Sequence, residues 1–243
     1  YGGTATGLAT VADSLTAIKY MVFDKKLCTA KELYDAVMAN WEGYEVLRQR
    51  IINEAPHFGN ADPYADEQME WVINAYYDAC KECYSSRTRN FKAGLYGAAD
   101  HVGQGYTTWA TPDGRKAGTP IADAASPVQG RAVNGPTAVF ASSLCYDHSK
   151  FMDGVCLNVR IHPTCLARED GIHKLRDMVK AYMEAGGAEA QFNVVSSETL
   201  RAAQAKPDEY RNLVVRIAGY SAYFVELTRD CQDDLISRTE HMI

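Results

Sequence analysis

Apolar side chains recur every three or four residues along several stretches of this chain, which predicts amphipathic helices. The first stretch begins at the capping box Thr29-Ala30-Lys31-Glu32 and runs to Ile51, so we expect one helix of about twenty residues there. Pro56 ends this helix, and a second helix is predicted over residues 66–86. A third helix over residues 172–183 stops at the glycine pair 186–187.

Other stretches have the alternation or the short apolar runs of β-strands. Residues 155–161 alternate with period two, and shorter runs cover residues 191–195 and 213–217, with a short helix between them that ends near Ala205. From residue 94 to residue 135 glycine and proline recur, which predicts a long irregular segment of the kind that is usually functional. Strands that alternate with helices indicate parallel strands and crossover helices, so we expect an α/β fold.

Composition limits the classes of function. The 243 residues are 47% hydrophobic and 23% charged, enough for one large domain or part of one. A net charge of −6 argues against general affinity for nucleic acid or anionic membranes. No apolar stretch approaches the roughly 18 to 20 residues of a membrane span, and no signal-peptide pattern opens the chain. We therefore expect no nucleic-acid or membrane partner.

The cysteines favour a reducing compartment. Seven of them at irregular spacing form an odd number in a chain too large to need disulfides, so we expect reduced thiols and a cytoplasmic protein. Cys80 and Cys83 form a CxxC pair, but no second pair or suitably spaced histidine completes a metal site. Their helical setting favours core or surface thiols over a pair of metal ligands.

The segment Arg216-Ile217-Ala218-Gly219-Tyr220-Ser221-Ala222 is the most informative candidate site. A glycine after a predicted strand is by itself compatible with an ordinary turn. Glycine is also the residue that suits a radical on a backbone carbon, because a side chain would crowd the plane over which the amide nitrogen and the carbonyl share the unpaired electron. It reaches positive φ without a Cβ penalty.

This segment resembles the radical loop of the glycyl radical enzymes, the family of pyruvate formate-lyase, the diol and hydroxyproline dehydratases, choline lyase and the arylacetate decarboxylases. Three further segments resemble hallmarks of the same family, in family order, so that the resemblance covers essentially the whole chain. They are Ala12-Asp13-Ser14-Leu15-Thr16-Ala17-Ile18-Lys19, His57-Phe58-Gly59-Asn60-Ala61-Asp62-Pro63-Tyr64 and Ala110-Thr111-Pro112-Asp113-Gly114-Arg115-Lys116-Ala117-Gly118.

The resemblance implies a fold and an architecture. The family folds as a ten-stranded α/β barrel made of two five-stranded halves, and this chain would supply the second half, with residues 1–120 in the barrel domain and residues 121–243 forming the glycine radical domain. Half a barrel leaves strand edges unpaired, so we expect the chain to fold poorly alone. The radical of Gly219 would lie in the closed, dry barrel interior, beside a catalytic cysteine on a loop upstream of Tyr1. We expect the chain to be the C-terminal part of a larger polypeptide.

The resemblance also implies roles for individual residues. Gly219 would store the radical, and Arg216, Tyr220 and Ser221 would anchor its loop, Arg216 through an ion pair. Tyr220 and Phe224 are expected to be packing groups. The polar side chains before the Thr-Pro-Asp-Gly-Arg hallmark would line the substrate pocket; of these, His101 is either an acid–base group or a structural hydrogen-bonding group. These pocket candidates are Asp100, His101 and Gln104.

The implied function is radical lyase chemistry on a small polar substrate, of the dehydratase type. The alternatives are an arylacetate-type decarboxylase, which the nearby Tyr106 and Trp109 leave open, a pyruvate formate-lyase-type acyltransferase, a stand-alone subunit that repairs a damaged radical domain, and a purely structural glycine. The radical would be protein-derived, with no metal or organic cofactor on this chain. The implied partners are the N-terminal remainder, an activating enzyme that carries S-adenosylmethionine and an iron–sulfur cluster, and a second copy in a homodimer.

Overall fold

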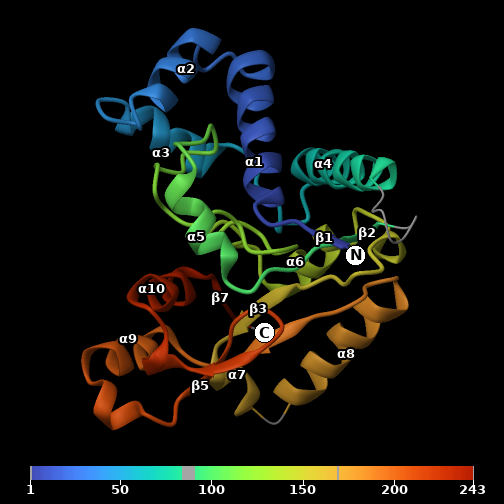
Figure 1. The fold of residues 1–243 in the computed structure, drawn as a ribbon, viewed down its shortest axis with the longest axis vertical. Coiled ribbons are helices and arrows are strands. Elements are labelled where there is room, and N and C mark those ends of the chain that lie inside the picture. Colours follow the sequence, from blue (N-terminus) through green and yellow to red (C-terminus); the bar gives the residue numbers. More distant parts are fainter. Residues whose placement is uncertain (1, 84–90, 169, 243) are drawn as a thin grey trace.

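The computed structural model describes residues 2–83, 91–168 and 170–242, and helices and strands alternate along them (Figure 1). The first part contains β1 (Gly2–Thr4), α1 (Leu8–Ile18), a π-helical segment (Lys19–Asp24), α2 (Ala30–Met38), α3 (Glu45–Glu54), α4 (Pro63–Glu82), β2 (Lys92–Gly94), α5 (Asp100–Thr107) and α6 (Pro136–Ser143). The second part contains a 3-10 turn (His148–Lys150), β3 (Asn158–Ile161), α7 (Pro163–Leu166), α8 (Gly171–Glu184), β4 (Gln191–Asn193), α9 (Ser197–Ala205), a 3-10 turn (Pro207–Tyr210), β5 (Val214–Arg216), β6 (Ser221–Tyr223), a 3-10 turn (Phe224–Glu226), α10 (Arg229–Ser237) and β7 (Glu240–His241).

Within the described ranges the strands form three small sheets. β1 pairs with β2 in parallel, and β3 pairs in parallel with both β4 and β7. The remaining pair, β5 and β6, is an antiparallel hairpin. The expectation of parallel strands joined through helices is confirmed for β1 to β4, and the hairpin is the exception because a tight turn joins its strands directly.

Figure 1 shows α1, α2, α3 and α4 at one end of the molecule and α8, α9 and α10 around the strands at the other, with α5 between them. Separate apolar clusters hold the two ends. One joins α1 to α4 through Leu8, Met69 and Ile73, and another surrounds the base of the β5–β6 hairpin through Val215 and Phe224. None of the helices in the described ranges combines the length and apolarity of a membrane span.

The single helix predicted from Thr29 to Ile51 is wrong. The capping box is present, with Thr29 Oγ1 accepting from the Glu32 N–H, but α2 ends at Met38 and α3 begins only at Glu45. Asn40 and Trp41 have positive φ between the two helices. The turn lets Trp41, only 1% exposed, donate from Nε1 to the carbonyl of Arg115, 3.1 Å away. Burial of this large ring outweighed the helical periodicity of the sequence.

The other helices agree with their patterns. α4 begins three residues before the predicted start because Asp62 caps it and Pro63 occupies its first turn; the predicted end at residue 86 lies outside the described residues. α8 and α9 confirm the later predictions. The segment over residues 94–135 is largely irregular, as expected, but includes α5. A Cβ at Gly105 of this helix would stand 2.4 Å from the carbonyl oxygen of Thr119, so glycine permits close packing there.

Candidate functional site

Gly219 lies at the tip of the β5–β6 hairpin. The hairpin register pairs Arg216 with Ser221, and the N–H of Ile217 donates to the carbonyl of Tyr220 at 2.9 Å. Two residues, Ala218 and Gly219, therefore make the turn, and Gly219 has φ +87°, a conformation that glycine adopts without strain.

The two faces of this turn differ sharply. Ile217 and Ala218 are buried, 2% and 6% exposed, and Phe224 beneath them is fully buried, which agrees with its expected packing role. Gly219 is exposed, and apart from its two chain neighbours no heavy atom of the described residues lies within 4 Å of the position that a Cβ would take. Tyr220 is 41% exposed, so within this chain it does not pack as expected. The part of this chain that the structure describes does not by itself form the closed interior that we expected around Gly219.

Arg216 anchors the start of the turn through amides. Its N–H donates to Oδ1 of Asn193 at 2.7 Å, and Nδ2 of Asn193 donates back to the Arg216 carbonyl at 2.6 Å. Its guanidinium Nε donates to Oε1 of Gln191 at 2.7 Å, and Nη1 lies 3.4 Å from Oγ of Ser221. In the described part of the chain this side chain is held by neutral hydrogen-bond partners, so the ion pair that we expected is replaced by an amide contact.

Gln191 and Asn193 are functional candidates that sequence reasoning missed. Oε1 of Gln191 also accepts the N–H of Gly219 itself, at 3.0 Å. Both amides stand two residues apart, at the two ends of the short strand β4, so they lie on the same face of it. Two polar residues at that spacing in an otherwise apolar strand were the available signal, because a buried amide needs hydrogen-bond partners.

The end of α10 holds the turn from the opposite side. Arg238 donates from Nη1 to the carbonyl of Ile217 at 3.1 Å, and its Nη2 lies 3.2 Å from Oδ2 of Asp123 and 3.0 Å from Oδ2 of Asp234. Burial raises the pKa of Asp234, but the charge of Arg238 and the neighbouring His101 together outweigh burial and lower the pKa to about 2. Asp234 therefore stays ionised and keeps Arg238 in place.

His101 belongs to this same buried cluster. Its Nδ1 lies 3.3 Å from Oδ1 of Asp123 and its Nε2 lies 3.0 Å from Oδ2 of Asp234. Neither ring nitrogen has hydrogen-bond geometry in the structure, so these are close contacts without aligned donors. The contacts tie α5 to α10 through a histidine that is completely buried.

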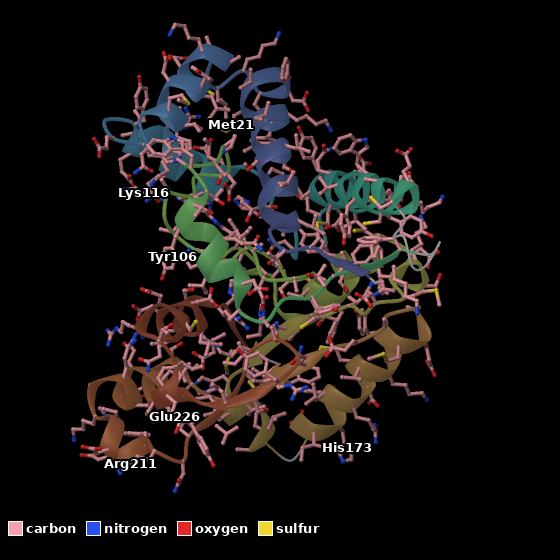
Figure 2. All side chains as sticks on the ribbon, in the orientation of Figure 1. Met21, Tyr106, Lys116, His173, Arg211 and Glu226 are labelled. Atoms are coloured by element: carbon pink, nitrogen blue, oxygen red, sulfur yellow. The ribbon has the colours of Figure 1, made fainter. Side chains whose placement is uncertain are left out.

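The three pocket candidates are not brought together. Asp100 and Gln104 are exposed on α5, whereas His101 points into the protein between two carboxylates. On the same helix Tyr106, visible between α5 and α10 in Figure 2, donates from its hydroxyl to Asp230. Trp109 donates from Nε1 to the carbonyl of Val37 at 3.0 Å. The hydroxyl of Tyr106 and the indole N–H of Trp109 thus each have a hydrogen-bond acceptor within this chain.

Three of the four hallmark segments meet in the first half of the chain. Asp13, fully buried, accepts the N–H of Phe58 at 2.8 Å and lies 3.2 Å from Nδ1 of His57. Ser14 Oγ stands 3.5 Å from Oδ1 of Asp113, which is also fully buried. These contacts hold α1, the turn before α4 and the Thr-Pro-Asp-Gly-Arg loop together. All three segments are far from the hairpin in the sequence.

The thiols of the CxxC pair lie in different environments. Cys80 lies in the last turn of α4 and is buried, whereas Cys83 directly follows the helix and is exposed. Sγ of Cys83 donates to the carbonyl of Ala79. The helical setting that we predicted is confirmed. Over the ranges that the structure describes, no group of three or more histidine, cysteine or acidic residues is placed to hold a metal ion.

Two family models match the chain. Residues 1–105 match the family described as pyruvate formate lyase-like, and residues 121–225 match the family described as glycine radical. The second match contains the whole hairpin and Gly219.

Individual relatives and solved structures agree with these matches. Trans-4-hydroxy-L-proline dehydratase of Clostridioides difficile is 40% identical over 96% of this chain and 30% of its own length. The 4-hydroxyphenylacetate decarboxylase glycyl radical subunit of Clostridium scatologenes is 37% identical over 97% of the chain and 28% of its own length. The glycerol-bound B12-independent glycerol dehydratase of Clostridium butyricum superposes with a TM-score of 0.93 and 37% identity, covering all of this chain and 30% of that one. The chain thus spans less than a third of these relatives, and it belongs to the glycyl radical enzyme family.

Proposed function

We propose that this chain is the C-terminal part of a glycyl radical lyase and that Gly219 stores its radical. The observation that carries the proposal is the geometry of Gly219, which presents an open Cα at the tip of a tightly anchored turn, within the region matched by the glycine radical family. A methylene in that position is accessible for hydrogen-atom removal, while the buried Ile217 and Ala218 hold the rest of the turn.

The chemistry is hydrogen-atom transfer. The Gly219 radical takes the hydrogen of a cysteine thiol outside this chain, so that a Cα–H bond forms and an S–H bond breaks. The resulting thiyl radical takes a hydrogen atom from the substrate, which then loses its leaving group, and the hydrogen returns along the same route. The protein's contribution is to position the groups and to exclude water.

The proposed partners follow from this chemistry. The N-terminal remainder of the polypeptide supplies the cysteine and encloses Gly219, which is exposed among the described residues of this chain. A separate activating enzyme, which carries an iron–sulfur cluster and cleaves S-adenosylmethionine, generates the radical, and the lyase works as a cytoplasmic homodimer. We place the boundary between the barrel part and the glycine radical domain at residues 120 and 121.

The favoured reaction is elimination of water or another leaving group from a small polar substrate. The similarity to hydroxyproline and glycerol dehydratases supports this branch. An aromatic decarboxylase is the alternative, supported by the similarity to the 4-hydroxyphenylacetate enzyme. The local partners of Tyr106 and Trp109 weigh against it, because both side chains already have structural roles. Asp100 and Gln104 are proposed substrate-side groups, and His101 is proposed to position α5.

Electron paramagnetic resonance tests the proposal. The full-length protein, activated anaerobically by its activating enzyme, is expected to show a doublet split by the remaining α-hydrogen of Gly219. Gly219→Ala is expected to abolish it. Gly43→Ala is the matched control, since Gly43 also has positive φ, +80°, and open space around a Cβ position, far from the hairpin in the sequence. A doublet of normal intensity in Gly219→Ala, or its loss in both variants, contradicts the assignment.

A further inference from the structure

Gln191 connects Gly219 to a buried thiol through one amide group. Its Oε1 accepts hydrogen bonds from the N–H of Gly219 at 3.0 Å and from Nε of Arg216 at 2.7 Å. Its Nε2 donates to Sγ of Cys156. The side chain is 6% exposed, so water does not compete for these contacts.

The orientation of this amide is determined by its neighbours. Two N–H donors converge on Oε1, and a rotated amide would place its own N–H groups against them. On the other side Cys156 serves as the acceptor, also for Nδ2 of Asn158 at 3.5 Å. Burial raises the pKa of the Cys156 thiol to about 12, so the sulfur stays neutral at physiological pH. These contacts therefore orient the oxygen of Gln191 toward Gly219.

We propose that Gln191 is a positioning residue for the radical-bearing glycine, an inference that rests on the function proposed above. A Cα radical is stabilised when the nitrogen lone pair and the carbonyl lie in register with the half-filled orbital. An acceptor on the Gly219 N–H makes the nitrogen a better electron donor and fixes the plane of the peptide. The three short contacts of Gln191 supply both effects from a rigid strand rather than from the turn itself.

Asn193 separates this role from simple support of the hairpin. It makes a comparable pair of hydrogen bonds, at 2.7 and 2.6 Å, but both go to the backbone of Arg216 and none to Gly219. Loss of either amide removes two hydrogen bonds to the hairpin. Only loss of Gln191 removes the acceptor from the glycine N–H.

The experiment compares Gln191→Met, Gln191→Glu and Asn193→Leu in the full-length activated protein. Gln191→Met keeps the shape and removes the acceptor, whereas Gln191→Glu keeps an oxygen for both donors. The readouts are the thermal unfolding midpoint, the hyperfine coupling of the Gly219 amide proton, and the anaerobic lifetime of the doublet. Gln191→Asn, which withdraws the oxygen by one methylene, takes the place of Gln191→Met if that variant does not fold.

We expect Gln191→Met and Asn193→Leu to lower the unfolding midpoint alike. Only Gln191→Met should change the amide-proton coupling and shorten the lifetime, by about fivefold, as the loss of one neutral hydrogen bond predicts. Gln191→Glu should restore both. If Gln191→Met shows the same amide-proton coupling and the same doublet lifetime as the wild type, this inference alone is overturned. The same holds if Asn193→Leu changes the coupling and the lifetime as much as Gln191→Met does. A wild type without the doublet overturns the proposed function and this inference with it.

Discussion

Arg238, directly after α10, donates a hydrogen bond from Nη1 to the backbone carbonyl of Ile217, 3.1 Å away. The same guanidinium contacts the carboxylates of Asp123 and Asp234. One side chain therefore links the C-terminal helix, the irregular segment before β3 and the turn that carries Gly219. His101 extends the link to α5, so elements from the middle and from the C-terminal part of the chain meet at this cluster.

Removal of this cation should destabilise the protein strongly. Arg238→Met leaves two buried carboxylates without their arginine, which costs about 3 to 5 kcal/mol of unfolding free energy. Denaturant unfolding of the wild type and of Arg238→Met measures this difference in unfolding free energy. Arg229→Met on α10 is the control, because its pair with Asp233 is exposed and contributes at most about 1 kcal/mol. Equal losses in the two variants would show that the Arg238 cluster adds nothing beyond a surface ion pair.

Stability should fall in mild acid because of His148. Burial lowers the pKa of this histidine; its Nε2 lies 2.6 Å from the Ser143 carbonyl and its Nδ1 accepts the Ala188 N–H, as a neutral ring does. The unfolded chain, with a histidine pKa of about 6.5, then binds more protons than the folded one. The contribution of the neutral His148 to the unfolding free energy is therefore constant above that pH and is lost as the pH falls below it.

His148→Gln removes this titration while keeping a donor and an acceptor. Unfolding free energies measured between about pH 7 and pH 5 should decline less steeply in the variant than in the wild type. His173→Gln is the control, since His173 is exposed on α8 (Figure 2). An identical slope in the wild type and His148→Gln would remove His148 as the cause.

Oxygen should cut the activated chain at one place. A radical on the Gly219 Cα reacts with oxygen there, and the exposed position of that carbon in this chain gives oxygen direct access once the turn is uncovered. Mass spectrometry after exposure of the activated full-length protein to air should find the chain cleaved at Gly219. The Gly219→Ala protein should remain intact under the same treatment. Loss of the doublet without truncation would argue that the spin resides elsewhere.

Asp13 should be a stability determinant of the first half. Asp13→Ala leaves the buried N–H of Phe58 without its acceptor and removes the partner of His57, a loss of about 2 to 3 kcal/mol. Asp35→Ala, which breaks an exposed pair with Lys31 on α2, should change the stability far less, because solvent screens that pair. Thermal or denaturant unfolding distinguishes them. A neutral Asp13→Ala would mean that this hallmark acts in function rather than in folding.

Local patterns sufficed for much of the fold. Some features depend only on neighbours within a turn or two, so the sequence predicts them directly. They are the capping box at Thr29, the glycines that end α8 and the alternation that includes β3. The helix predicted through Trp41 failed because its ring is buried against Arg115, far along the chain. Such a contact is absent from any local window.

The sequence by itself determined which atom is the candidate for the chemistry. Glycine at position 219 follows from the motif and from the requirement for an unhindered α-carbon, and no tertiary information was needed to select it. Only the tertiary structure decided what holds that glycine. Gln191, Asn193 and Arg238 reach the turn from other elements, and His101 is buried between two carboxylates rather than exposed with Asp100 and Gln104. Hydrogen-bond partners and burial arise when distant segments pack, and periodicity along the chain does not encode them.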